Sequence, residues 1–245
     1  MLSPSVVVGC PFSHRDWIID AWFEATERAL VAAGVESWSY AFVGDNADPT
    51  WTKIEQHRER TGVDVRLARE PNARDIDVRD WRQARYGYMV TIRNMLLDQV
   101  RDIGPDVFFS IDSDILVADS SIADLLEDLA GGADAAGSCT FLSKPKGPKP
   151  SHKTPSCARS RPNSALNTRP YFENAVYRVD VLMAFKAMSP AAYACDYRFH
   201  HHGEDIGWSQ NCAERGLELV YDTRSVSKHV MSPDALHVVD LRCGY

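Results

Sequence analysis

Two aspartates lie two residues apart directly after an apolar run in this 245-residue chain. They are Asp112 and Asp114, in the stretch DVFFSIDSDILV. Carboxylates this close repel each other when both are ionised, unless a cation or strong hydrogen-bond donors lie between them. Hard divalent ions such as Mg2+ or Mn2+ take oxygen ligands and commonly complete their shell with water and substrate phosphates. The pair therefore favours a site for a metal-bound diphosphate, with an ordinary Asp-rich turn as the alternative.

A second acidic pair, Glu204 and Asp205, opens the helix-like stretch EDIGWSQNCAERG, and His229 follows a later strand-like run. A positioned carboxylate can take a proton from a hydroxyl group. Acidic residues in a first helical turn also match the helix dipole, and a single histidine is commonly structural, so both alternatives stay open. Three histidines, His200–His202, precede the pair. We expect an extended segment there, whose alternating side chains would not share one zinc ion.

The surrounding pattern predicts the elements that position these residues. Strand-like and helix-like stretches alternate from residue 5 to residue 68, and a long helix is expected over about 81–103. The run 106–111 is short, aromatic and β-branched, as in a buried central strand. We also expect a helix over 181–188. Alternation of this kind indicates an α/β fold with a mainly parallel sheet, whose ligands bind beyond the carboxyl ends of the strands.

Composition narrows the class of protein. Hydrophobic residues make up 44% and charged residues 25%, which is ordinary for a globular domain, and we expect one domain over 1–245. The net charge of -7 argues against bulk adhesion to nucleic acid or anionic membranes. The apolar runs are too short to span a bilayer, and no signal-peptide pattern is present, so we expect a cytoplasmic protein. Six cysteines without a CxxC pair suggest neither a disulfide framework nor a zinc ribbon.

One segment departs from this composition. Between Ala135 and Phe172 the sequence has seven Lys and Arg residues and no acidic residue, among many Pro and Ser residues. We expect a mobile basic loop at about 143–170. Three interpretations remain open for it: a solvated excursion, a lid that closes on a donor diphosphate, or a surface that binds DNA or RNA phosphates.

Two long stretches resemble a known family. IRNMLLDQVRDIGPDVFFSIDSDILV looks like the helix, strand and DXD segment of GT-A-fold glycosyltransferases. HGEDIGWSQNCAERGLELVYDTRSVSKHV is similar to the family's later pattern of a Glu-Asp motif opening a helix, a glycine before a last strand and a histidine after it. The order and spacing of these parts match over most of the chain. The resemblance implies a Rossmann-like GT-A fold and a nucleotide-sugar donor.

The resemblance also implies roles for individual residues. Asp114 and His229 fall at metal-ligand positions, and Asp112 falls where the family contacts the metal shell or the donor ribose. Glu204 and Asp205 occupy the motif whose carboxylate acts as general base or contacts the acceptor.

Further residues are expected on the donor side. Cys10, Pro11 and Phe12 follow the first strand, where the family's base-binding residues lie, and Asp45 follows the second. Proline and aspartate are also ordinary turn residues at strand ends. Arg93, in the Arg-Asn motif of the long helix, could stabilise the leaving group or form a salt bridge within the helix layer.

Together these observations predict a glycosyltransferase that uses Mn2+ or Mg2+, held by Asp112, Asp114 and His229, and a UDP- or GDP-sugar. The acceptor would be a hydroxyl group, with a modified DNA nucleobase as one candidate through the basic loop. One alternative is a non-catalytic nucleic-acid-binding protein, for which Asp112 and Asp114 would be dispensable. Another is a sugar nucleotidyltransferase, although the glycine-rich, lysine-bearing loop of that class does not follow VVVGC.

Overall fold

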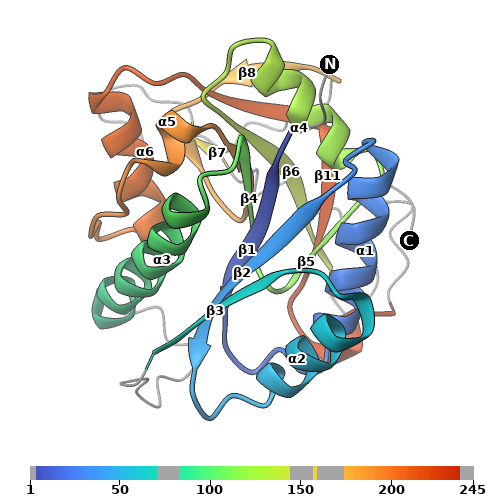
Figure 1. Cartoon of the computed structure of the whole chain (residues 1–245). Coiled ribbons are helices and arrows are strands. Elements are labelled where there is room, and N and C mark those ends of the chain that lie inside the picture. The colour runs from blue at the N-terminus through green and yellow to red at the C-terminus, as the bar shows by residue number, and fades with distance from the viewer. Residues whose placement is uncertain (1–3, 71–82, 144–156, 159–173, 238–245) are drawn as a thin grey trace.

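The computed structural model describes residues 4–70, 83–143, 157–158 and 174–237 (Figure 1). Strands and helices alternate through the first half of the chain, as predicted. The helices are α1 (Ile19–Ala32), α2 (Thr50–Thr61), α3 (Gln83–Ile103), α4 (Ser121–Ala130), α5 (Pro190–Tyr193), α6 (Glu204–Glu214) and the 3-10 turn η1 (Pro233–Ala235). The strands are β1 (Val6–Phe12), β2 (Trp38–Asp45), β3 (Val65–Glu70), β4 (Val107–Ile111), β5 (Ile115–Val117), β6 (Ala135–Ser143), β7 (Cys157–Ala158), β8 (Val176–Arg178), β9 (Val181–Leu182), β10 (Phe185–Met188) and β11 (Leu219–Val230).

The main sheet has the strand order β3-β2-β1-β4-β10-β6-β11-β5, and β8 pairs with the start of β11. β1 runs parallel to β2 and β4, and β6 runs parallel to β11. β10 lies between β4 and β6 and is antiparallel to both, so β6 and β11 point in the same direction as β4. The carboxyl ends of β1, β2, β4, β6 and β11 therefore meet at one edge of the sheet, which is where an α/β fold binds its ligands.

Helices cover both faces of the sheet. Figure 1 shows α1, α2 and α4 on one side and α3, α5 and α6 on the other. Trp22 and Phe23 of α1 pack against Tyr40 and Phe42 of β2 on the first side. The second side has its own apolar cluster, which includes Leu96, Tyr193, Trp208 and Tyr221. Burial of each side chain of this size contributes roughly 1.5–3 kcal/mol to the stability of the fold. The apolar clusters on both faces therefore hold the sheet and its edge in place.

The helix expected over 181–188 is wrong. This stretch forms β9 and β10, and Ala184 between them has a positive φ of 28°, which ends regular structure there. All four residues of β10 are buried because the strand lies inside the sheet under helices on both faces. A short apolar run cannot be assigned to a buried helix or a buried strand by periodicity alone. Pairing with β4 and β6 therefore overrides the helix propensity of its Leu, Met, Ala and Lys residues.

Two further expectations concern membrane-spanning helices and the basic loop. None of the helices in the described ranges is long and apolar enough to cross a bilayer. The basic loop at about 143–170 falls mostly outside the described residues. From that stretch the structure gives the backbone of β7, which pairs antiparallel with β9.

Candidate active site

The turn after β4 carries both aspartates at the carboxyl edge of the sheet. The backbone N–H of Asp112 donates to the carbonyl of Ala184, and the N–H of Ile115 donates back to the carbonyl of Asp112, each at 2.9 Å. Both carboxylates are partly exposed, whereas the strand before them is fully buried. The predicted placement of Asp112 and Asp114 at the ligand edge agrees with this arrangement.

Asp114 contacts side chains from two distant segments. Nε2 of His229 lies 3.3 Å from its Oδ1, and Nη2 of Arg15 lies 2.9 Å from its Oδ2. His229 is brought there by the antiparallel pairing of β11 with β5, in which the N–H of Val230 also donates to the carbonyl of Asp114 at 2.8 Å. Arg15 comes from the segment that follows β1. The structure thus joins the predicted pair Asp114 and His229 and adds an arginine that the sequence did not indicate.

The charges in this group support one another. Burial alone would raise the pKa of Asp114, but the hydrogen bond and charge of His229 and the charge of Arg15 outweigh it, so its pKa lies below the ordinary value. Burial alone would lower the pKa of His229, but Asp114 outweighs it, so the pKa of His229 is raised. The Asp114 carboxylate is therefore kept ionised by the guanidinium of Arg15 and the imidazole of His229.

Asp112 has a different partner. Nη2 of Arg93 lies 2.7 Å from its Oδ1, and Nε of Arg93 lies 3.5 Å from Oε1 of Glu204. Burial raises the pKa of Asp112, Arg93 opposes that rise, and the charges of Asp205 and Asp114 add to it. The buried guanidinium on α3 is therefore the bridge between the two predicted acidic pairs.

The second acidic pair lies in the first turn of α6, as the sequence predicts. Nζ of Lys186, which is fully buried on β10, lies 2.6 Å from Oδ1 of Asp205. Sequence reasoning missed Lys186 because the stretch around it was interpreted as a helix. Its signal was a single lysine inside the apolar run AFKAM, where a charge needs a buried partner.

The segment before α6 is held by the Arg-Asn motif. Nδ2 of Asn94 donates to the carbonyl of Tyr197 at 3.0 Å, and the N–H of Tyr197 donates to Oδ1 of Asn94 at 2.8 Å. The Tyr197 ring lies 5.6 Å from the guanidinium of Arg93 and 5.5 Å from Nζ of Lys186. Both residues of the motif therefore support the region of the second acidic pair: Arg93 lies next to Glu204, and Asn94 holds the backbone at Tyr197.

The expected donor-side residues are placed less favourably. Cys10, Pro11 and Phe12 all belong to β1 and are buried, and Phe12 packs edge-on against Trp51. Burial and the charge of Asp112 raise the pKa of the Cys10 thiol well above its ordinary value. Any contact of Cys10 or Phe12 with a donor would use the backbone, because their side chains fill the core.

Asp45 ends β2 at the same edge of the sheet. Its Oδ1 accepts a hydrogen bond of 3.0 Å from the N–H of Ala47, as in an ordinary aspartate turn. Asp45 therefore serves the local turn.

The predicted metal ligands lie at the carboxyl edge of the sheet. Over the described ranges, no group of three or more His, Cys, Asp and Glu side chains is gathered around one point. Asp114 and His229 are the two predicted ligands in contact, while Asp112 is turned to Arg93. A carboxylate and an imidazole suit Mn2+, and an ion of this kind takes its other ligands from water and phosphate oxygens. The two residues fit as the protein's share of such a shell.

The three histidines lie close together, contrary to the expected extended segment. His200–His202 forms a turn closed by the N–H of Gly203, which donates to the carbonyl of His200 at 3.0 Å. Ring centroids are 4.0 Å apart for His201 and His202 and 4.4 Å apart for His200 and His201. The turn brings these rings to the entrance of α6, directly before Glu204.

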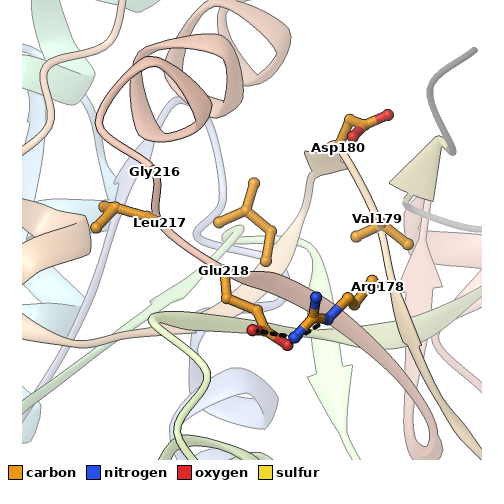
Figure 2. Close-up of a pocket in the computed structure, with 7 residues that line it drawn as sticks. Arg178, Val179, Asp180, Gly216, Leu217 and Glu218 are labelled. Atoms are coloured by element: carbon orange, nitrogen blue, oxygen red, sulfur yellow. Dashed lines mark hydrogen bonds and ion pairs between the residues drawn. The ribbon is translucent and has the colours of Figure 1, made fainter.

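A surface pocket lies away from this group (Figure 2). Its volume is about 380 Å³, and its lining comes from the segment between β8 and β9 and from the segment that leads into β11. Figure 2 shows Arg178 and Glu218 joined across it by an ion pair. Because the pocket lies at the start of β11 and His229 lies near its end, the two features belong to opposite edges of the sheet.

Comparison with known proteins gives matches in structure. No protein-family model matches the chain, and neither does any curated protein. The mannosyltransferase PcManGT from Pyrobaculum calidifontis, solved with GDP-Man and Mn2+, has a TM-score of 0.61 at 12% identity, over 93% of this chain and 57% of that one. S. aureus TarS 1-349 with UDP-GlcNAc has a TM-score of 0.60 at 11% identity, over 96% of this chain and 62% of that one.

A third structure, GalNAc-T7 with UDP, GalNAc and Mn2+, has a TM-score of 0.59 at 12% identity, over 94% of this chain and 46% of that one. The chain thus spans about half to three-fifths of the length of these proteins. At such low identity the likeness concerns the fold. It confirms the predicted α/β fold of the GT-A type.

Proposed function

We propose that the chain is a metal-dependent glycosyltransferase that moves a sugar from a nucleotide-diphosphate donor to a hydroxyl acceptor. The contact of Asp114 with His229 carries this proposal, because it pairs an oxygen and a nitrogen ligand at the carboxyl edge of a GT-A-type sheet. Solved proteins of the same fold that contain Mn2+ with a nucleotide or nucleotide sugar support the choice of reaction.

On the donor side, Asp114 and His229 would hold Mn2+ or Mg2+. The ion would supply positive charge to the departing diphosphate. Asp112 would contact the metal shell or the donor ribose, and Arg93 would keep it oriented through their 2.7 Å ion pair. Arg15 adds a second fixed cation beside Asp114, where the diphosphate charge develops.

The nucleotide would lie along the ends of β1 and β2. Pro11 and the backbone of Cys10 and Phe12 would border the base, and Asp45 would border the donor at the end of β2. A UDP- or GDP-sugar is the expected donor, in line with the GDP-Man and UDP-GlcNAc present in the similar structures.

On the acceptor side, Glu204 or Asp205 would take the proton of the attacking hydroxyl. Their position in the first turn of α6, linked through Arg93 to Asp112, supports a role next to the donor. One candidate for the acceptor is a modified DNA nucleobase, with the DNA bound through the basic loop.

Nucleotide release tests the proposed reaction. UDP-, GDP- and dTDP-sugars would be incubated with the protein and Mn2+, with and without chelator, and the freed nucleotide measured. We expect metal-dependent release from one donor, its loss in Asp114→Ala, and its retention in Asp119→Asn, which changes an exposed aspartate paired with Arg28. If no donor is hydrolysed and no nucleotide binds with Mn2+, the proposal is wrong.

A further inference from the structure

A fully buried lysine makes the two acceptor-side carboxylates unlike each other. Nζ of Lys186 lies 2.6 Å from Oδ1 of Asp205, and it also lies 5.1 Å from the ring of Trp208 and 5.5 Å from that of Tyr197. An ammonium group removed from water loses several kcal/mol of hydration, which only a close, well-oriented anion offsets. Lys186 and Asp205 therefore form one buried unit between β10 and α6.

Glu204 has a weaker partner, although it is equally buried. Its side chain is 6% exposed and that of Asp205 is 8% exposed, so solvent access does not distinguish them. Among the described residues, the cation next to Glu204 is Arg93. Its Nε lies 3.5 Å from Oε1 of Glu204, which is longer than a good hydrogen bond. The same guanidinium is engaged by Asp112 at 2.7 Å. The difference between the two carboxylates therefore comes from their partners.

The pKa values of Asp205 and Glu204 are shifted in opposite directions. Burial alone would raise the pKa of Asp205, but Lys186 and Arg93 outweigh it, so the pKa of Asp205 lies below its ordinary value. Burial and the charge of Asp205 raise the pKa of Glu204, and Arg93 only partly opposes that rise. A carboxylate whose pKa is raised toward neutrality is the better proton acceptor, and one held low is the poorer.

We propose that Lys186 is a positioning residue that fixes Asp205 as an anion, and that Glu204 is the carboxylate that receives the acceptor proton. This rests on the proposed function. As the acceptor oxygen forms its bond to the anomeric carbon, the bond from that carbon to the diphosphate oxygen breaks. The electron pair leaves on the diphosphate, and the hydroxyl proton passes to an oxygen of Glu204. The Lys186 and Asp205 pair exchanges no proton and keeps the first turn of α6 in place.

Charged and titratable groups of several elements act on the two carboxylates, and their arrangement must be kept intact in any test. The charged groups that act on Glu204 are Asp205 of α6, Arg93 of α3 and Asp112 of the turn after β4, while Lys186 of β10 and Tyr197 of the segment before α6 interact with Asp205. Substitutions are therefore limited to changes that preserve shape.

A titration of side-chain carboxyl groups tests the assignment without any turnover. The protein would be labelled with 13C at Asp and Glu carboxyl carbons, and Glu204→Gln and Asp205→Asn would assign the two signals. We expect the Glu204 signal to titrate above an ordinary glutamate and the Asp205 signal below an ordinary aspartate. In Lys186→Met the Asp205 midpoint should rise, and in Lys186→Arg it should stay low. An unchanged Asp205 midpoint in Lys186→Met overturns the proposal.

Lys186→Met leaves a buried anion unpaired and could fail to fold. The double variant Lys186→Met with Asp205→Asn removes both charges, so it should fold. Its Glu204 midpoint should fall, because the charge of Asp205 is gone, but should stay above that of an ordinary glutamate, because burial persists. Lys53→Met serves as the matched control, because Lys53 pairs with Asp20 at the exposed surface, 2.5 Å away. If the double variant folds and the Glu204 midpoint falls to the ordinary value, the division of roles is wrong.

The second readout is the pH dependence of donor hydrolysis. In this reaction water takes the place of the acceptor. Glu204→Gln should lower the rate at least ~100-fold and remove the acidic limb of the profile. Asp205→Asn should lower the rate less and keep that limb. The reverse pattern overturns the proposal. If the wild type hydrolyses no donor, the proposed function fails, while the carboxyl titration still decides the assignment of Lys186.

Discussion

Oδ1 of Asp114 and Nε2 of His229 lie 3.3 Å apart, although one belongs to the turn after β4 and the other to the penultimate residue of β11. The register of β11 against β5, with His229 opposite Ile115, creates this contact. A shift of one residue would turn the imidazole to the other face of the sheet. The sheet edge therefore brings one carboxylate oxygen and one imidazole nitrogen together.

Asp114→Asn should weaken Mn2+ binding at least ~10-fold, because the amide keeps the shape of the side chain and loses its charge. Free Mn2+ measured by electron paramagnetic resonance during a titration gives the affinity directly. Asp119→Asn is the control, since its side chain is 61% exposed and lies beyond β5. Equal Mn2+ affinity in wild type and Asp114→Asn would exclude Asp114 as a ligand.

Arg93→Met should lower the free energy of unfolding by roughly 3–5 kcal/mol, because it strands the carboxylates of Asp112 and Glu204 beside a buried apolar group. Arg101→Met changes the same helix at ion pairs with the exposed Asp98 and Asp196 and should lose only about 1 kcal/mol. Urea unfolding of both variants makes the comparison. Similar losses in the two would mean that the Arg93 bridge contributes no more than a surface pair.

A second buried acidic group should give the fold a pH-dependent stability. Asp128 of α4 lies 3.3 Å from Nη2 of Arg224, which also holds the fully buried Asp222 at 2.9 Å. Burial and the charge of Asp222 raise the pKa of Asp128 to about 7, with Arg224 opposing. The folded chain thus keeps a proton that the unfolded chain releases, so this contribution is present below about pH 4 and is lost as pH rises through about 7.

Asp128→Asn should remove that dependence, since the amide mimics the protonated acid at every pH. The wild type should lose unfolding free energy as the pH rises from 5 to 8. The variant should lose less than the wild type over the same range, by on the order of 1–2 kcal/mol. Glu127→Gln, an exposed neighbour on α4 that also meets Arg224, is the matched control. Parallel curves of stability against pH for wild type and Asp128→Asn would contradict the raised pKa of Asp128.

The sequence predicted what local pattern and strand position determine. Alternating strands and helices gave the α/β fold, and the polar turn after an apolar strand put Asp112 and Asp114 at the correct edge. Chain order also gave the first turn of α6 with its acidic pair. These features depend on residues that lie near one another in the chain, so the order of residues in the sequence is enough to predict them.

Features that depend on long-range pairing could not be predicted in this way. The ion pair of Arg15 with Asp114 joins residues 99 positions apart, and nothing near Arg15 marks it. Lys186 acquires its partner only because β10 enters the sheet between β4 and β6. Phe12 was assigned to the donor by strand position alone, whereas packing against Trp51 directs its ring into the core.

At Gly207, α6 approaches the backbone of the preceding segment closely. An added Cβ at Gly207 would lie 1.9 Å from the carbonyl oxygen of Arg198, so the backbone before the histidine turn would have to move. Gly207→Ala should therefore lower the free energy of unfolding by about 1–3 kcal/mol and reduce donor hydrolysis, since Glu204 moves with its helix. Mn2+ binding should persist, because Asp114 and His229 lie on other elements.

Gly87→Ala provides the opposite outcome on α3. An added Cβ there meets nothing within 4 Å, and alanine is favoured over glycine in a helix interior by roughly 0.8–1 kcal/mol, so this variant should gain stability. Thermal unfolding and Mn2+ titration of the two variants side by side separate close packing from a general intolerance of glycine substitution. Normal stability in Gly207→Ala would show that α6 is not held against Arg198, and Glu204 would then need another source of positioning.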